Sequence, residues 1–284
     1  MRKTFRFIPV AAGLAAIFLM AGCDKLKSRD QQNQGVHDFA SAKYSDAVEH
    51  FTKAAQLDPT NSTAVSYLAT AYYAQWIPGA DSPQNHEFAA HAREEFKKVL
   101  DLNPKDSTAL QYLGNMAYQE ALPLPDDQKI AKFNEAADWF HKEIEAKPDD
   151  KQAYYYLGVI AYGKWHQQLG QAELKMNMKS DDPGPLKDKK IKDQLRQDYG
   201  PIVDQGIADL KKAIDIDHDY ADAMVYEQLL IREKAYLDDD RADYDKDVAL
   251  ADQIRDQSMD AKRRNDAKAA AAASTGGIVQ DEAK

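Results

Sequence analysis

The feature that most constrains this chain is a ten-residue phrase that occurs three times, at residues 64–73, 109–118 and 153–162. Each copy has alanine first, a Tyr-Leu pair in its middle, a small residue after that pair and tyrosine last. A degraded fourth copy occupies residues 223–232. Such self-similarity predicts an array of stacked units, because a single unit is too small to bury its apolar face alone.

A second phrase, rich in lysine and apolar residues, precedes the first two copies. It reads Phe-Thr-Lys-Ala-Ala-Gln-Leu-Asp-Pro at residues 51–59 and Phe-Lys-Lys-Val-Leu-Asp-Leu-Asn-Pro at residues 96–104. The two phrases together resemble the tetratricopeptide repeat (TPR), a hairpin of about 34 residues made of two helices, A and B. The resemblance covers residues 28–232 and implies an all-α fold, a right-handed superhelix or α-solenoid.

The phrases divide the chain into four repeats, which we expect at residues 28–61, 62–106, 107–150 and 151–220. A degenerate repeat with capping helices should follow at residues 221–265, and an Ala-rich disordered tail at residues 266–284. In the degenerate repeat, Glu227 and Gln228 stand where the other copies have leucine and a small residue. We therefore expect no further repeat to dock tightly against that helix.

Helix B of the first repeat places Ala47, Phe51 and Ala54 at positions i, i+4 and i+7, so the three side chains share one helical face. The small Ala47 lets helices A and B approach each other, and Phe51 fills the seam between them. The first two of these positions recur as Ala92 and Phe96, as Ala136 and Phe140, and as Gly206 and Leu210.

The last three repeats are longer than the standard period, and their extra residues fall between helix A and helix B. These inserts are residues 76–83, 122–127 and 164–199. In the third insert, residues 167–178 should extend helix A, and helix should start again at residues 191–196. All A–B turns of a solenoid lie on the same edge, so the inserts should line one rim. They are either tolerated surface loops or binding elements.

The first 22 residues have the pattern of a secretory leader. Arg2, Lys3 and Arg6 precede an apolar run over residues 7–21, which is shorter than the ~20 residues of a comfortable membrane span. The run ends in Leu-Met-Ala-Gly-Cys, which resembles the lipobox of bacterial lipoproteins, although a methionine stands where that family usually has leucine.

This second resemblance implies a lipoprotein signal peptide over residues 1–22, lipidation of Cys23 and a tether over residues 23–33. Cys23 is the only cysteine in the chain, so no internal disulfide can form. The implied location is the bacterial cell envelope, with the protein anchored in the inner or the outer membrane and facing the periplasm. The alternative is a stray cysteine beside an uncleaved anchor helix.

The net charge and the absence of catalytic motifs disfavour several classes of function. The formal net charge of −10 disfavours binding to nucleic acid, because an acidic surface repels phosphate backbones. His86 and His91 suggest a zinc-protease pair, but their spacing of five residues turns them about 140° apart around a helix. The sequence also has no Gly-rich phosphate loop and no Gly-x-Ser-x-Gly elbow. We therefore expect a protein that is not an enzyme, with no cofactor and no metal site.

The TPR resemblance implies a partner-binding groove on the concave face. In that family, fixed positions of helix A face the groove and hold a partner's peptide or helix. The alternative for the tyrosines at these positions is that they pack between neighbouring A helices. Mapped onto this chain, the groove positions are Ser66, Thr70, Tyr73, Gln111, Asn115, Tyr118, Tyr155, Val159 and Tyr162.

Two functions follow from these patterns. The first is a membrane-tethered, non-catalytic scaffold or adaptor that grips a protein or peptide segment in its concave groove, in a plan similar to pilotins of type IV pili and to outer-membrane assembly lipoproteins. The alternative is a small-molecule or glycan binding protein that uses the groove and the insert rim. The long fourth repeat also resembles uncharacterised acidobacterial TPR proteins, which implies no mechanism.

Overall fold

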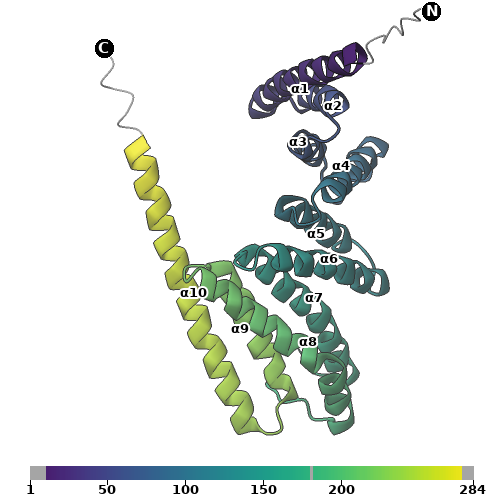
Figure 1. Cartoon of the computed structure of the whole chain (residues 1–284). Coiled ribbons are helices and arrows are strands. Elements are labelled where there is room, and N and C mark those ends of the chain that lie inside the picture. Colours follow the sequence, from purple (N-terminus) through teal and green to yellow (C-terminus); the bar gives the residue numbers. More distant parts are fainter. Residues whose placement is uncertain (1–10, 180–181, 277–284) are drawn as a thin grey trace, which may run out of the picture. The chain divides into compact units, whose positions relative to one another are not determined.

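The computed structural model describes residues 11–179 and 182–276, and the side chains of residues 23–179 and 182–273. Within these ranges the chain forms ten α-helices, one short 3-10 helix and no β-strand (Figure 1). The expected all-α fold is confirmed. The first ten residues of the expected signal peptide lie outside the described residues. None of the described helices combines the length and the apolar character needed to span a membrane.

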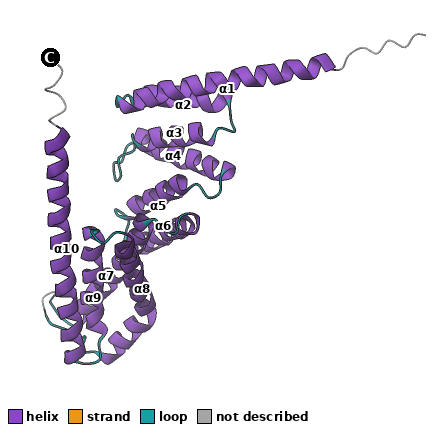
Figure 2. Cartoon of the chain, turned by 60° about the vertical axis from the view of Figure 1, so that its left-hand side comes forward, coloured by secondary structure: helices purple, strands orange, loops and turns teal. Residues whose placement is uncertain are grey.

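The first compact unit, Met1–Pro123 (unit 1), holds the first five helices. Each packs mainly on the next one along the chain, which is the contact order of a solenoid (Figure 2). The helices are α1 (Ala11–Ala40), α2 (Tyr44–Leu57), α3 (Ser62–Tyr73), α4 (Pro83–Leu102) and α5 (Ser107–Ala121).

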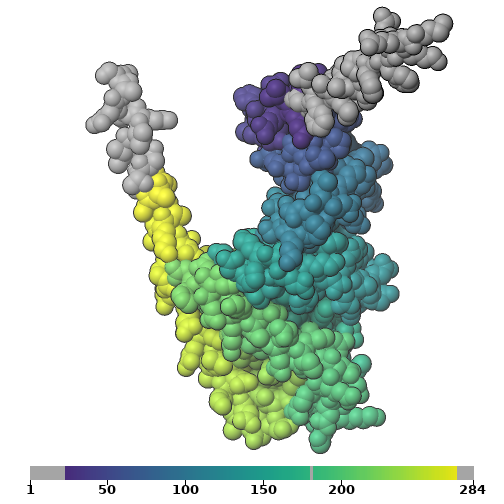
Figure 3. All heavy atoms as spheres, in the orientation of Figure 1, coloured from purple at the N-terminus to yellow at the C-terminus, as the bar shows by residue number. Residues whose placement is uncertain are grey.

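The second compact unit, Leu124–Lys284 (unit 2), holds α6 (Asp126–Ala146), α7 (Lys151–Lys175), α8 (Lys189–Ile216), α9 (Ala221–Lys234), the 3-10 helix η1 (Ala235–Leu237) and α10 (Arg241–Gly276). Its α-helices also pack in chain order, and α9 contacts α7 as well as α8. The last helix, yellow in Figure 1 and in Figure 3, runs along α9.

Helices α3, α5 and α7 are the A helices of the second to fourth repeats, and each begins at a capping side chain. The side-chain oxygens of Asn61, Asp106 and Asp150 accept a hydrogen bond from a backbone N–H in the first turn. Asn and Asp are favoured at this position because they satisfy a donor that the helix leaves unpaired. The turn that ends one repeat thus starts the next.

A stacked aromatic pair joins successive repeats. In each pair a phenylalanine of helix B lies against a tyrosine sixteen residues later, in helix A of the following repeat. Both rings therefore bury apolar surface between two hairpins rather than within one. The pairs are Phe51 with Tyr67, Phe96 with Tyr112, and Phe140 with Tyr156, with ring centroids 5.3, 4.8 and 4.9 Å apart.

Small residues allow helices A and B to touch, as the sequence predicts. A Cβ atom added to Gly35 would lie 2.6 Å from the Phe51 ring, and one added to Gly158 would lie 2.3 Å from Cγ of Leu210. The alanines predicted to serve the same purpose on helix B are completely buried. They are Ala47, Ala92 and Ala136.

The expected tether over residues 23–33 is helical in the structure. These residues belong to α1, which packs on α2. Ser28 is completely buried, and its hydroxyl donates a hydrogen bond of 2.8 Å to the carbonyl oxygen of Ala54. Contacts with α2, more than twenty residues away in sequence, hold this polar segment as helix A of the first repeat.

The extra residues of the long repeats mostly lengthen helices. The second insert leaves a connection of only residues 122–125, because α6 already begins at Asp126. In the third insert, α7 continues to Lys175 and α8 begins at Lys189, close to the predicted extension and restart.

The third insert fastens the C-terminal cap of unit 2. Leu186 is buried, and its N–H donates to the carbonyl oxygen of Tyr236 at 2.9 Å. Lys192 donates from Nζ to the carbonyl oxygen of Asp238 at 2.6 Å, and Arg196 donates to the carbonyl oxygen of Leu237. The insert therefore closes on the η1–α10 turn of its own unit.

Helix α9 packs on α7 and α8 although it carries Glu227 and Gln228, and its Ala223 and Leu230 are completely buried. Within the described residues, the elements that follow it are η1 and the long helix α10, not a further repeat. The expectation of a disordered tail is wrong for its first part. The tail is helical as far as Gly276, and residues 277–284 lie outside the described part. Where the tail begins, α10 is held by Asp219, which accepts hydrogen bonds from the side chains of Arg264 and Lys268.

Candidate functional site: a hollow in unit 1

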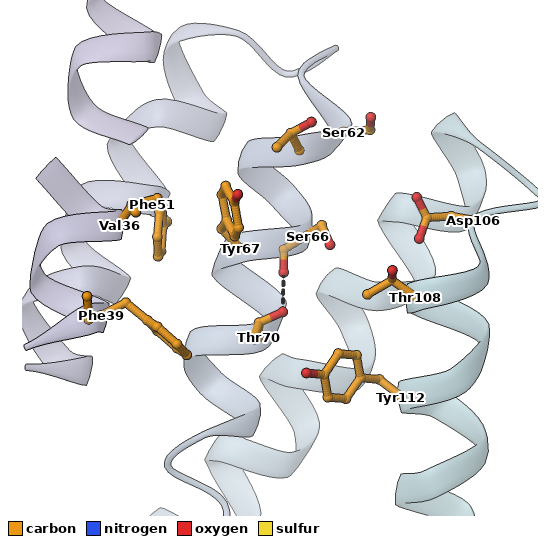
Figure 4. Close-up of a pocket in the computed structure, with 12 residues that line it drawn as sticks. Val36, Phe39, Phe51, Ser62, Ser66, Tyr67, Thr70, Asp106, Thr108 and Tyr112 are labelled. Atoms are coloured by element: carbon orange, nitrogen blue, oxygen red, sulfur yellow. Dashed lines mark hydrogen bonds between the residues drawn. The ribbon is translucent and has the colours of Figure 1, made fainter. Parts of the chain in front are cut away.

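A hollow of about 500 Å³ opens in unit 1 between the A helices of the first three repeats. Figure 4 shows residues of α1 and α2 on one side of α3, and residues of α5 on the other. The lining residues are Val36, Phe39, Ala40, Phe51, Ser62, Thr63, Ser66, Tyr67, Thr70, Asp106, Thr108 and Tyr112.

One side of the hollow is apolar. Val36 of α1 and Tyr67 of α3 both line the hollow and are 41% and 39% exposed. Tyr67 is held in place because its ring stacks on Phe51, which is 1% exposed. Phe39 lies next to this pair (Figure 4). A ligand can therefore cover an apolar surface that the fold has already ordered.

The other side is polar and almost uncharged. Helix α3 contains no charged residue, and its contribution to the hollow is mainly hydroxyl groups. The hydroxyl of Thr70 donates to the carbonyl oxygen of Ser66 at 2.8 Å (Figure 4). Asp106, at the start of α5, is the only charged side chain among the lining residues, and it accepts a hydrogen bond of 3.0 Å from the N–H of Ala109.

The structure brings part of the predicted groove into this hollow. Ser66 and Thr70 line it directly. Tyr73 does not line it, but its ring contacts that of the lining residue Tyr112, with centroids 4.6 Å apart. The remaining predicted residues of unit 1 lie on α5 outside the lining. They are Gln111, Tyr118 and Asn115, whose Oδ1 atom is buried with no hydrogen-bond partner among the described residues.

In unit 2 the predicted groove residues pack against the chain's own α9. Tyr155 contacts Tyr226 with ring centroids 5.8 Å apart, and Tyr162 contacts the same ring at 5.6 Å. Val159 is buried. Burial raises the pKa values of Tyr155 and Tyr162 well above the ordinary range. These tyrosines lie as in the alternative interpretation, in which they pack between neighbouring A helices.

The apolar side of the hollow could not be found from the groove positions alone. Val36 and Phe39 belong to helix A of the first repeat, which lacks the leucine of the recurring phrase. The sixteen-residue spacing from Phe51 to Tyr67, repeated twice along the chain, is the signal that could have placed these two rings together.

The two histidines considered as zinc ligands, His86 and His91, both lie on α4 but contact different partners. A ring nitrogen of His86 lies 2.9 Å from the carboxylate of Asp81, and the ring of His91 stacks on Tyr72 with centroids 4.8 Å apart.

Capped helix pairs, stacked in order and joined by aromatic pairs, define an all-α solenoid of the TPR type. No protein-family model matches the chain, and no curated protein matches its sequence. Among solved structures, the chain is similar to a crystal structure of the MamA protein, with 15% identity, a TM-score of 0.52, and coverage of 84% of this chain and 93% of that one. It is also similar to residues 41 to the end of MamA from Desulfovibrio magneticus RS-1, with 17% identity, a TM-score of 0.53, and coverage of 84% and 97%. This likeness concerns the fold alone.

Proposed function

We propose that this protein is a non-catalytic interaction scaffold that binds a peptide segment of a partner protein in the hollow of unit 1. The observation that carries the proposal is an exposed apolar surface, Val36 and Tyr67, beside hydroxyl groups on the A helices. Rigid aromatic side chains with neighbouring hydrogen-bonding groups are typical of protein recognition surfaces. In unit 2 the predicted groove residues are engaged with α9, so the proposal concerns unit 1.

The test compares two arginine substitutions that add the same side chain and the same charge. Ser66→Arg places it in the hollow, whereas Ala90→Arg places it at an exposed position of α4 outside the lining. Random-peptide display against the immobilised full chain should enrich peptides with the wild type and with Ala90→Arg, but not with Ser66→Arg. Circular dichroism verifies that both variants are folded. Equal enrichment by all three proteins would remove the hollow from the proposal.

A tether to the membrane is a separate part of the proposal. It is supported by the lipobox-like residues that precede Cys23 and by the exposure of Cys23 in the structure. Two or more acyl chains hold a protein stably at a bilayer, whereas one chain holds it only marginally. We expect Cys23→Ser to move the protein from the membrane fraction of a bacterial host to the soluble fraction, or to leave the precursor uncut. A Cys23→Ser variant that is processed and stays in the membrane fraction contradicts the tether.

The alternative is a small-molecule or glycan ligand. The hollow lies within the ~300–1,000 Å³ range of small-ligand sites, and its hydroxyl groups suit a sugar. None of its lining residues comes from the inserts, so this alternative depends on the hollow without the insert rim. A thermal-shift screen with soluble oligosaccharides and metabolites would favour it if one compound stabilised the wild type but not Ser66→Arg.

A further inference from the structure

We infer that the hollow of unit 1 selects a peptide that carries an apolar side chain and, a few residues away, a lysine or arginine. This inference rests on the proposed peptide binding and specifies the chemistry of the partner. It follows from the charges around the hollow and from the order of its apolar and acidic groups across α3.

The charge in the hollow is unbalanced. Asp106 is its only charged lining residue, and no lysine, arginine or histidine lines it. Within the described part of the chain, Asp106 takes part in no salt bridge. Its side chain accepts from the N–H of Ala109 at 3.0 Å and from the amide of Asn103 at 3.4 Å. The N-terminus of α5 offsets part of this charge, but a concave site whose only formal charge is negative still favours cations over carboxylates.

A basic side chain of a bound peptide can pair with the carboxylate of Asp106. The binding of an acidic peptide or of a free C-terminal carboxylate would instead place like charges together beside Asp106, with no basic side chain in the lining to receive them.

The geometry sets the spacing. The apolar group of Val36, Phe51 and Tyr67 lies toward α1 and α2, whereas Asp106 lies across α3 on α5 (Figure 4). An extended peptide advances about 3.3 Å per residue. A peptide that reaches from Tyr67 on α3 to Asp106 on α5 must therefore separate its apolar and cationic side chains by a few residues.

The experiment removes the negative charge of Asp106 while keeping its role as the N-cap of α5. Asparagine and aspartate are about equally good N-cap residues, so Asp106→Asn keeps the bond to Ala109 and removes only the carboxylate charge. Random heptapeptides are displayed against the full wild-type chain and against Asp106→Asn. We expect wild-type selection to enrich peptides with an aromatic or aliphatic residue and a Lys or Arg a few positions away. Selection on Asp106→Asn should retain the apolar residue and lose the basic preference.

An affinity measurement on one selected peptide completes the test. The peptide is synthesised with its lysine and with glutamate in that place, with both termini blocked. The lysine form should bind the wild type at least about tenfold more tightly at about 50 mM salt, and this ratio should shrink at about 500 mM salt and in Asp106→Asn. Equal binding of the two forms, or an unchanged ratio in Asp106→Asn, would overturn the inference. If the inference fails in this way but Ser66→Arg still abolishes peptide binding, the proposed function remains intact. A failure to enrich any peptide on the wild type would contradict both.

Discussion

Glu143 is a carboxyl group that the fold holds out of water without a partner. It lies on α6, is 1% exposed, and neither of its carboxylate oxygens has a hydrogen-bond partner among the described residues. Burial, together with the nearby charge of Asp150, raises the pKa of Glu143 to about 8. The folded state therefore binds this proton more tightly than the unfolded chain, in which the carboxyl group has its ordinary pKa of 4.5.

The stability contributed by this group falls as pH rises between those two pKa values, because the folded state must either keep the proton or bury a charge. We expect Glu143→Gln, which cannot ionise, to be more stable than the wild type at about pH 8.5. The gain in the free energy of unfolding there should exceed the gain at about pH 5 by roughly 3–4 kcal/mol. Urea unfolding of both proteins at the two pH values measures it, and an equal gain at both would contradict the prediction.

Gly158 illustrates a second residue-scale constraint, because it lies where α7 touches α8. Gly158→Ala would force the side chain of Leu210 to move, and we expect it to lower the free energy of unfolding by about 1–3 kcal/mol. Gly170, on the same helix, has open space where its Cβ would be, so Gly170→Ala should stabilise by about 0.5–1 kcal/mol. Thermal unfolding of the two variants gives the comparison. A Gly158→Ala protein as stable as Gly170→Ala would show that the close approach is not required.

At the scale of elements, the third insert clamps the cap of unit 2. Lys192→Met and Arg196→Ala each remove a donor to the η1–α10 turn, so together they should raise hydrogen–deuterium exchange in α9 and α10. Exchange in unit 1 should stay the same. Lys189→Ala is the control, because Lys189 is exposed and its salt bridge among the described residues is with Asp193 of its own helix. Unchanged exchange in α9 and α10 of the double variant would contradict the clamp.

The A helices of the later repeats could be predicted because their signal is local. The recurring Tyr-Leu phrase and a preceding Asn or Asp cap lie within one helix, and α3, α5 and α7 begin where the repeats were expected. Helix α1 could not be placed in the same way. Its polar segment is helical through contacts with α2, such as the hydrogen bond from Ser28 to Ala54, and no local pattern encodes that contact.

The candidate site, like the fold, could be predicted only in part. Ser66 and Thr70 follow from the groove positions of the repeat. Tyr155 and Tyr162 lie at equivalent positions but contact α9. Docking of α9 depends on burying Glu227 and Gln228, which polarity argues against, and burial accordingly raises the pKa of Glu227. The packing of α9 thus explains why the groove positions of unit 2 are covered by the chain itself.

At the scale of the whole molecule, the continuity of α1 bears on how the hollow would be presented. Cys23 and Val36 lie on one helix, thirteen residues apart, which corresponds to ~20 Å along its axis. With the proposed lipid on Cys23, Val36 at the near edge of the hollow would lie about this far along α1 from the anchor. A partner segment close to the membrane surface would then be the accessible one.

The measurement that bears most directly on peptide binding in unit 1 is site-specific photo-crosslinking of the full chain to a display-selected peptide. A photoreactive amino acid is placed either at Thr63, an exposed lining residue of α3, or at Ala90, an exposed residue of α4 outside the hollow. Peptide bound in the hollow predicts strong crosslinking from position 63 and background from position 90. Equal crosslinking from both positions, or crosslinking from position 90 alone, would contradict binding in the hollow.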